Sequence, residues 1–288
     1  MKTFFPENTS SRDLHHIMLG TVIPRPIAFV STIDSQGIKN LAPFSYFNAV
    51  SSLPPKMMFS VSRKPDGSKK DTLLNIEDTG ECVINMVSYD MVRQMTIAGF
   101  GFEKDTDEFE KSGLHPVRSE LVKVSGVLES PIRYECKLNK IIELGDKPGE
   151  CSIVLCDVVC IHIDENIFEE NKIKPEKTNI IGRLGGIQYI KINKDNIFSA
   201  LQPRKTIPIG FDNLPESILY SKILTGNEIA EIAGLDSLPS KKEIIENYSF
   251  LKKHKPEHLH YFAKMEIASG NIKEAAAILM AREYFFKD

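Results

Sequence analysis

Strand-like runs joined by turns instead of long helices are the feature of this sequence that most constrains its fold. Residues 27–33 (IAFVSTI) are followed by the turn DSQG and a second run, which indicates a hairpin. Further strands are predicted at 44–51, 56–62, 81–88, 132–144 and 151–163, the last two around a turn at 145–149. Short helices at 72–79 and 89–98 interrupt them without a regular strand–helix alternation. We therefore expect a mainly β (α+β) domain and exclude a Rossmann fold.

The pattern becomes helical after a boundary near residues 201–208. Helices are predicted at 215–224, from the capping box at Ser240, from Pro256 to Gly270, and from Asn271 to Phe286. We expect two domains, 1–205 and 206–288, with an all-helical C-terminal extension as the second. The apolar residues of the last two helices, such as Leu259 and Leu279, are expected to pack on the first domain.

Charge and cysteine usage exclude several classes of protein. The net charge is −3 and no basic block is present, so no nucleic-acid partner is expected. No apolar run approaches the roughly 20 residues that span a bilayer, and the first residues do not form a signal peptide. The five cysteines include no CxxC pair, which favours a reduced, cytoplasmic protein. Cys156 and Cys160, four residues apart in one strand, are expected on the same face of that strand.

Three segments carry side chains suited to a phosphate attached to a flat ring: residues 24–32, 40–55, and 59–63 with 70–76. They offer short hydroxyl donors, two cations, and a helix start at Asp71 and Thr72, where free N–H groups favour an anion. Asn48 can both donate to and accept from a ring edge. The hydroxyls are those of Ser45, Ser51, Ser60 and Ser62, and the cations are Arg63 and Lys70. Serines that merely end strands, with Asp71 as an ordinary helix cap, are the alternative interpretation.

These segments resemble the flavin reductase-like, FMN-binding split-barrel family. The stretches RPIAFVST, NLAPFSYFNAVSSLPP, FSVS with KKDTLLNI, TGECVIN and IGRLGGIQY match its signature in order and spacing, over roughly residues 12–200. The resemblance implies a split β-barrel with short inserted helices, assembled as a homodimer with one flavin per subunit near the interface. The helical tail after about residue 205 is not part of the common family core.

Carried over by position, the resemblance assigns residues to two parts of the flavin. Ser45, Asn48, Ala49, Val50 and Ser51 would line the isoalloxazine ring or the ribityl chain. Ser60, Ser62, Arg63, Lys70, Asp71 and Thr72 would surround the ribityl phosphate. Asp71 is acidic, so it is expected to cap the helix or to contact a ribityl hydroxyl. Arg183 and Tyr189 lie where a late loop could approach the flavin.

The implied activity is an NAD(P)H-dependent flavin reductase that passes hydride from a nicotinamide to FMN, with FAD as an alternative cofactor. The flavin carries this chemistry, so no catalytic acid or base is expected. Two other functions remain open: an FMN-containing electron carrier that serves a redox protein partner and lacks a nicotinamide site, and a non-redox binding protein.

Histidines outside these segments are interpreted as structural. His254, His258 and His260 have metal-like spacing, but Pro256 splits them and no acidic or cysteine partner is evident nearby. No metal site is therefore predicted. His115 could face a nicotinamide pocket, but a surface-loop histidine is the favoured interpretation.

Overall fold

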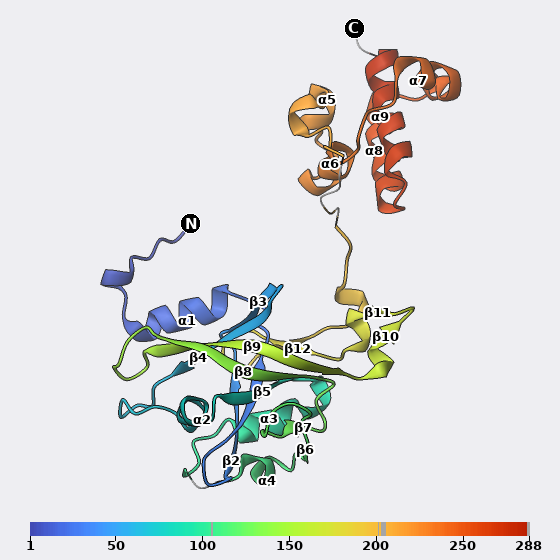
Figure 1. Ribbon diagram of the computed structural model, residues 1–288. Coiled ribbons are helices and arrows are strands. Elements are labelled where there is room, and N and C mark those ends of the chain that lie inside the picture. The colour runs from blue at the N-terminus through green and yellow to red at the C-terminus, as the bar shows by residue number, and fades with distance from the viewer. Residues whose placement is uncertain (105, 201, 203–205, 287–288) are drawn as a thin grey trace. The chain divides into compact units, whose positions relative to one another are not determined.

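The computed structural model describes residues 1–104, 106–200, 202 and 206–286 (Figure 1). The chain divides into two compact units, Met1–Phe198 and Ser199–Asp288. Half of the predicted boundary stretch 201–208, namely residues 201 and 203–205, lies outside the described residues. The division at 205/206 stays a prediction.

A seven-stranded antiparallel sheet dominates the first unit, in the order β2-β1-β5-β8-β9-β4-β3 (Figure 1). This confirms the expected mainly β class with inserted helices, and the strands follow the predicted runs closely. Their bounds are β1 Ala28–Ile33, β2 Lys39–Phe44, β3 Phe47–Ser52, β4 Pro55–Ser62, β5 Glu81–Met86, β8 Ile132–Glu143 and β9 Cys151–Ile163.

The two ends of this sheet are joined by a very short connection. β2 and β3 are its outermost strands, yet only Ser45 and Tyr46 separate them in the chain. Three peptide steps span at most about 11 Å, so the sheet must curve until its ends approach each other. The backbone N–H of Ser60 donates to the Tyr46 carbonyl at 2.9 Å, which ties this connection to β4.

Short elements decorate the sheet. The helices are α1 Ser11–Thr21, α2 Asp71–Thr79, α3 Val92–Ala98 and α4 Glu108–Ser112. The small strand pairs are β6 Pro116–Val117 with β7 Gly126–Val127, β10 Phe168–Glu169 with β11 Lys172–Ile173, and β12 Ile181–Arg183 with β13 Tyr189–Lys191. Single 3₁₀ turns occupy Pro6–Asn8, Tyr89–Met91, Glu165–Ile167, Pro175–Lys177 and Lys194–Asn196.

Alternation along the strands places a core on the inner face of the sheet. On β4 every second residue is buried, and Phe59 and Val61 pack with Val154 of β9. Leu73 and Ile76 of α2 pack into the same core. Among the described residues, no helix is both long and apolar enough to cross a lipid bilayer.

A β-bulge in β9 overturns the expected orientation of Cys160. Cys136 of β8 pairs with Val158, but the next residue back, Glu135, pairs with Cys160, so Val159 is an extra residue. The extra residue shifts by one the alternation of side chains between the two faces of β9. Cys156 therefore points into the core, where its Sγ lies 3.9 Å from that of Cys82, while Cys160 lies on the opposite face beside Glu135.

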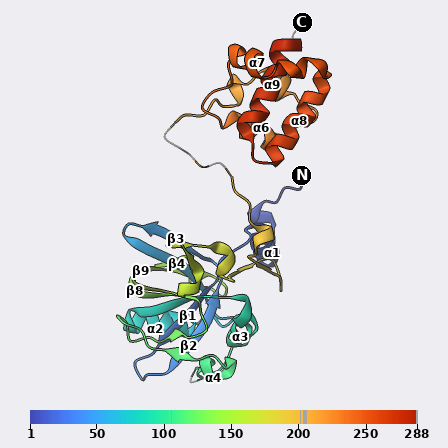
Figure 2. The same ribbon diagram turned by 90° about the vertical axis from the view of Figure 1, so that its right-hand side faces the viewer.

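The second unit contains α5 Glu216–Leu219, α6 Gly226–Ala233, α7 Lys241–Asn247, α8 Pro256–Ala268 and α9 Ile272–Phe286, with 3₁₀ turns at Phe211–Asn213 and Ser249–Lys253. The predicted starts at Ser240 and Pro256 are confirmed, and α9 extends to Phe286, the last described residue. The helix predicted at 215–224 is shorter, and α6 was not predicted. α8 and α9 lie side by side (Figure 2), and α6 and α7 also contact α9.

The helical unit has a core of its own. Leu259, Ala276 and Leu279, expected to pack on the first domain, are fully buried among residues of this unit. The expectation was wrong for these residues because α6 and α7, together with the α8–α9 pair, already cover their apolar faces.

Candidate functional site

Four of the predicted site residues share the outer face of the sheet. Ser60 and Ser62 alternate with the core residues of β4, so their side chains point away from the core. Asn48 lies directly across from Met58, and Ser51 directly across from Lys56. Because directly paired residues point to the same face, Asn48 and Ser51 join the two β4 serines. Within the described chain, the hydroxyls of Ser60 and Ser62 make no hydrogen bond.

A bulge in β3 creates this arrangement. The register with β4 shifts between Ala49 and Ser51, which leaves Val50 as the extra residue. Without it, residues three apart such as Asn48 and Ser51 would point to opposite faces. Asn48, Ala49 and Val50 are exposed. The hairpin therefore presents polar groups and free surface that a ligand or a second subunit could cover.

The segment from Arg63 to Lys70 holds four cationic side chains, and three of them are paired with carboxylates. Arg63 lies 3.7 Å from Glu143, Lys64 lies 3.1 Å from Asp71, and Lys69 contacts both Glu77 and Glu143. Arg63 also donates to the carbonyls of Gly67 and Gly145. These contacts fix the loop against the β8–β9 turn, and they occupy Arg63 more fully than an anion-binding role requires.

Lys70 is the exception in this segment. It is half-buried, and no carboxylate in the described part of the chain pairs with it. Its ammonium lies 5.6 Å from the centroid of the Phe44 ring. Burial lowers the pKa of Lys70, and the neighbouring Lys64 lowers it further. The Cys151 thiol opposes this lowering, and Cys151 pairs directly with Ser62 across the β4–β9 ladder.

The start of α2 differs from the prediction at two residues. Lys70 occupies the cap position with an extended backbone, whereas Asp71 is already helical and its carboxylate contacts Lys64 instead of capping. Thr72 is buried, and its hydroxyl accepts a hydrogen bond from Asn40 at 2.9 Å. Its side chain is therefore committed to the interior. What Thr72 can offer a ligand is its backbone N–H, one of the free donors at a helix start.

Ser45 lies apart from the serines of β4, on the short connection between β2 and β3. Its hydroxyl accepts from the Arg25 guanidinium at 3.5 Å. Arg25 is buried and also donates to the carbonyls of Val22 and Leu184, so it anchors the end of α1 and a late loop. In that loop Arg183 stacks 4.5 Å from the centroid of the Tyr189 ring and pairs with Arg25 in the backbone.

The structure thus places Asn48, Ser51, Ser60 and Ser62 on one face of the β3–β4 hairpin, with Ser51 near one end of β4 and Ser62 at the other. It commits Arg63, Asp71 and Thr72 to other contacts. Sequence reasoning missed Phe44 and Cys151, which flank Lys70. Phe44 stands within the matched stretch 40–55, so the sequence held a signal for it. Cys151 reaches this region only because β9 pairs with β4, and the sequence held no signal for that pairing.

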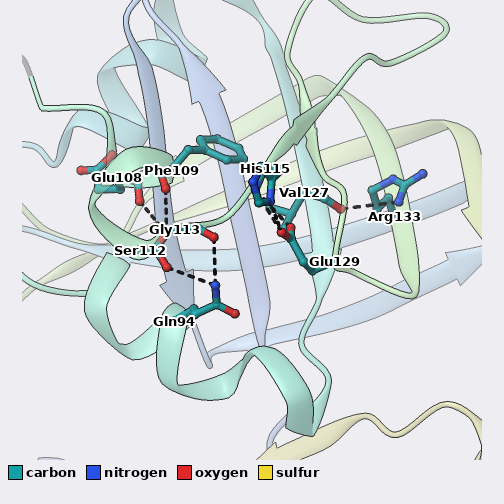
Figure 3. Close-up of polar contacts among 9 residues, drawn as sticks. All are labelled: Gln94, Glu108, Phe109, Ser112, Gly113, His115, Val127, Glu129 and Arg133. Carbon is teal, nitrogen blue, oxygen red and sulfur yellow. Dashed lines mark hydrogen bonds and ion pairs between the residues drawn. The ribbon is translucent and has the colours of Figure 1, made fainter.

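His115 projects from the loop after α4, where Glu129 orients it (Figure 3). Its Nδ1 lies 2.6 Å from the Glu129 carboxylate, which also accepts from the His115 backbone N–H. The imidazole is nevertheless 73% exposed. Gln94 steadies the same loop by donating to the carbonyls of Ser112 and Gly113. His115 is thus an exposed loop histidine with a fixed ring.

The histidines of the helical unit do not gather into a metal site. His260 is buried, with its Nδ1 2.7 Å from the Ser221 hydroxyl. His254 and His258 instead lie edge-on to the ring of Phe262. Burial lowers the pKa of His260, as expected for a neutral imidazole in a core.

Comparison with known proteins gives a consistent picture for the first unit. The family model described as "Flavin reductase like domain" matches residues 19–176. A protein of Aquifex aeolicus (strain VF5) is 41% identical over 189 residues, which cover 65% of this chain and 94% of the relative. Nitrilotriacetate monooxygenase component B from Bacillus cereus is 34% identical, with a TM-score of 0.66 over 69% of this chain and 98% of the other. Pseudomonas fluorescens 2-nitrobenzoate 2-nitroreductase is 28% identical, with a TM-score of 0.63 over 72% and 98% of the two chains.

Proposed function

The chain belongs to the flavin reductase-like family, and from this premise we propose that it binds FMN and uses it to accept hydride from NADH or NADPH. The flavin would lie on the outer face that carries Asn48, Ser51, Ser60 and Ser62. Relatives that include a monooxygenase component and a nitroreductase support a redox function linked to flavin.

The residues present fit a phosphorylated flavin. Lys70 is the observation that carries this proposal, because a half-buried ammonium with no carboxylate partner is stabilised by an anion. The free Ser62 hydroxyl and the first N–H groups of α2 would donate to the same phosphate. Arg63 and Asp71 would act indirectly, by holding the 63–70 loop in place through their ion pairs.

The protein's contribution to the reaction is binding and orientation. Bound FMN supplies the hydride-accepting ring. Asn48 offers donor and acceptor groups to a ring edge, and the β3 backbone after it is exposed on an outermost strand of the sheet. No side chain at this face needs to act as an acid or base, because the flavin carries the hydride chemistry.

We also propose that the chain forms a homodimer through the β3–β4 hairpin. Val50 and Leu53 are apolar and expose 47% and 92% of their surfaces at this hairpin. Such residues are costly to leave in water. Light scattering on the purified chain would report the mass of a dimer if this is right, and that of a monomer if it is wrong.

Titration with FMN and with riboflavin, which lacks the phosphate, tests the proposed grip on the phosphate. The wild-type chain should prefer FMN. Lys70→Met should weaken FMN binding about tenfold or more, the size expected for one charge-assisted contact, and should leave riboflavin binding unchanged. Lys123→Met is the matched control, since Lys123 is an exposed lysine of the same unit that lies outside the 63–70 loop, and it should bind FMN normally.

Steady oxidation of NADH or NADPH in the presence of FMN tests the activity. Turnover with either nicotinamide supports the reductase. A chain that binds FMN but oxidises neither nicotinamide would be an electron carrier, and one that binds no flavin would contradict the whole proposal. FAD titrated under the same conditions decides which flavin is preferred.

A further inference from the structure

Glu135, Cys160 and His162 form a cluster outside the proposed flavin site. Cys160 pairs directly with Glu135 across the β8–β9 ladder, and His162 follows two residues later on the same face. Within the described residues this is the one group in which three such ligand atoms all lie within 4.8 Å of one another. The bulge at Val159 is what brings Cys160 to this face.

The Glu135 carboxylate is held in place before any ligand arrives. It is fully buried and accepts hydrogen bonds from the backbone N–H groups of Glu120 and Leu121, at 2.7 and 2.6 Å. The 118–125 loop is thus fixed over this face, and its Val122 and Val124 pack on Val83. Second-shell donors of this kind orient a carboxylate ligand.

The spacing of the three ligand atoms suits a tetrahedral metal ion. Typical Zn–S and Zn–N bond lengths place a sulfur and a nitrogen about 3.5 Å apart in a tetrahedral site, and Cys160 Sγ lies 3.6 Å from His162 Nε2. His162 Nε2 lies 2.6 Å from Glu135 Oε1 as a hydrogen bond. To bind a metal between them, His162 Nε2 and Glu135 Oε1 would have to move apart by less than about 1 Å.

A cysteine nucleophile explains the cluster less well. In a catalytic triad the acid orients the histidine through one ring nitrogen while the other nitrogen serves the nucleophile. Here both Cys160 and Glu135 approach the same atom, Nε2 of His162. Convergence of thiol, imidazole and carboxylate on one point is instead the arrangement of a metal centre.

We propose that Glu135, Cys160 and His162 bind a divalent transition-metal ion, of which Zn²⁺ is the best match. A thiolate and an imidazole favour Zn²⁺ over Mg²⁺ or Ca²⁺, which take oxygen ligands. On binding, the Cys160 thiol releases its proton to solvent. Nε2 of His162 gives up the proton it donates to Glu135, so the bound neutral imidazole carries its one proton on Nδ1. Water would complete the coordination, since three protein ligands leave a fourth position.

The cluster has a route to solvent. His162 is 26% exposed and lines a cavity of about 860 Å³ together with Arg133 of β8 and Asp164 after β9. A metal could enter from this side while the 118–125 loop covers the other. The proposal is independent of the flavin site, because none of the three residues belongs to it.

Calorimetric titration of the chelator-treated full chain with Zn²⁺ tests the site. We expect one saturable site per chain and a rise in melting temperature when the metal is added. Cys160→Ser should weaken Zn²⁺ binding about 100-fold or more, since even second-shell changes cost 10–100-fold. His162→Asn should have a comparable effect, and it keeps the proposal testable if one variant is unstable.

Cys151→Ser is the matched control, because Cys151 is a partly buried thiol of the same strand that lies outside the cluster. It should bind Zn²⁺ as the wild type does. Zn²⁺ should also protect Cys160 from alkylation in the wild-type chain. Equal Zn²⁺ affinity in the wild type and Cys160→Ser, or no saturable binding at all, would overturn the proposal.

Discussion

At the scale of single residues, the burial of Lys70 costs stability in the ligand-free chain. An ammonium that is removed from water without an opposite charge is disfavoured, and the lowered pKa of Lys70 reflects that cost. The Phe44 ring offsets part of it, because a cation over an aromatic face is attracted to it. Residues that destabilise the ligand-free chain in this way are typical of binding sites.

The first prediction follows from this imbalance. Lys70→Met should raise the stability of the flavin-free chain by about 0.5–1 kcal/mol, because the substitution keeps the apolar stem and removes the unpaired charge. Its melting temperature without flavin should therefore rise while its FMN affinity falls. A Lys70→Met chain that melts below the wild type would show that the ammonium has a structural partner.

Glu108 gives the second prediction, on pH. Burial raises the pKa of its carboxyl to about 7, and nearby Asp107 adds to this, although the Leu41 N–H donates to it and opposes the rise. The folded chain therefore holds this proton more tightly than the unfolded one. The resulting stability is fully present below pH of about 4.5 and is lost as the pH rises through about 7.

Glu108→Gln should remove this pH dependence. Its amide oxygen can still accept from Leu41, so the fold is kept. Between pH of about 5 and 8.5 the free energy of unfolding of the wild type should fall by about 1 kcal/mol more than that of Glu108→Gln. This figure is smaller than the full pKa shift of Glu108 implies, because its carboxyl is only partly buried and solvent screens it. Melting curves at both values measure this, with Glu110→Gln, an exposed neighbour, as the control. An equal change in stability between the two pH values for Glu108→Gln and the wild type would contradict this prediction.

At the scale of elements, two bulges decide where chemistry-bearing side chains point. The β3 bulge brings Asn48 and Ser51 to one face, and the β9 bulge turns Cys160 away from Cys156. Neither is visible in the sequence, because an extra residue is defined only against the partner strand. The strands themselves were predictable, since turns and alternation are local signals.

The candidate site was predictable to the same extent. The positions of Ser60 and Ser62 follow from simple alternation, and Lys70 follows from its place before a helix. The burial of Thr72 could not be foreseen, because the amide that binds its hydroxyl belongs to Asn40, on a strand more than thirty residues earlier. Long-range pairing of this kind leaves no periodic trace in the sequence.

Helix α6 supplies a prediction at this scale. It opens with a reciprocal capping box, in which the Thr225 hydroxyl accepts from the Glu228 N–H and the Glu228 carboxylate accepts from the Thr225 N–H. Thr225→Ala should cost about 1 kcal/mol of stability in the helical unit, seen as a lower helix-melting temperature by circular dichroism. Ser237→Ala, an exposed serine of the same unit, should stay within about 0.5 kcal/mol of the wild type. If both variants melt alike, the box is not stabilising.

At the scale of the whole molecule, the two units have separate cores. The helical cluster draws only on residues of the second unit, whereas the clusters around the sheet draw only on the first. A unit that buries its own apolar faces can fold on its own. We therefore propose that the first unit and the helical extension are independent folding units, although the sequence pattern had indicated that the extension would pack on the first domain.

Leu279→Ala in the full chain tests this independence. Leu279 is fully buried in the helical core, so shortening its side chain to alanine should lower the stability of the helical unit by about 2–5 kcal/mol. The temperature at which FMN fluorescence reports flavin release should not move, because that core contains none of the first unit's described residues. Met265→Ala, at a position 67% exposed in the same unit, should change neither transition. If Leu279→Ala lowered the flavin-release temperature along with helix melting, the helical extension would be supporting the flavin site, and the two units would have to be treated as one cooperative fold.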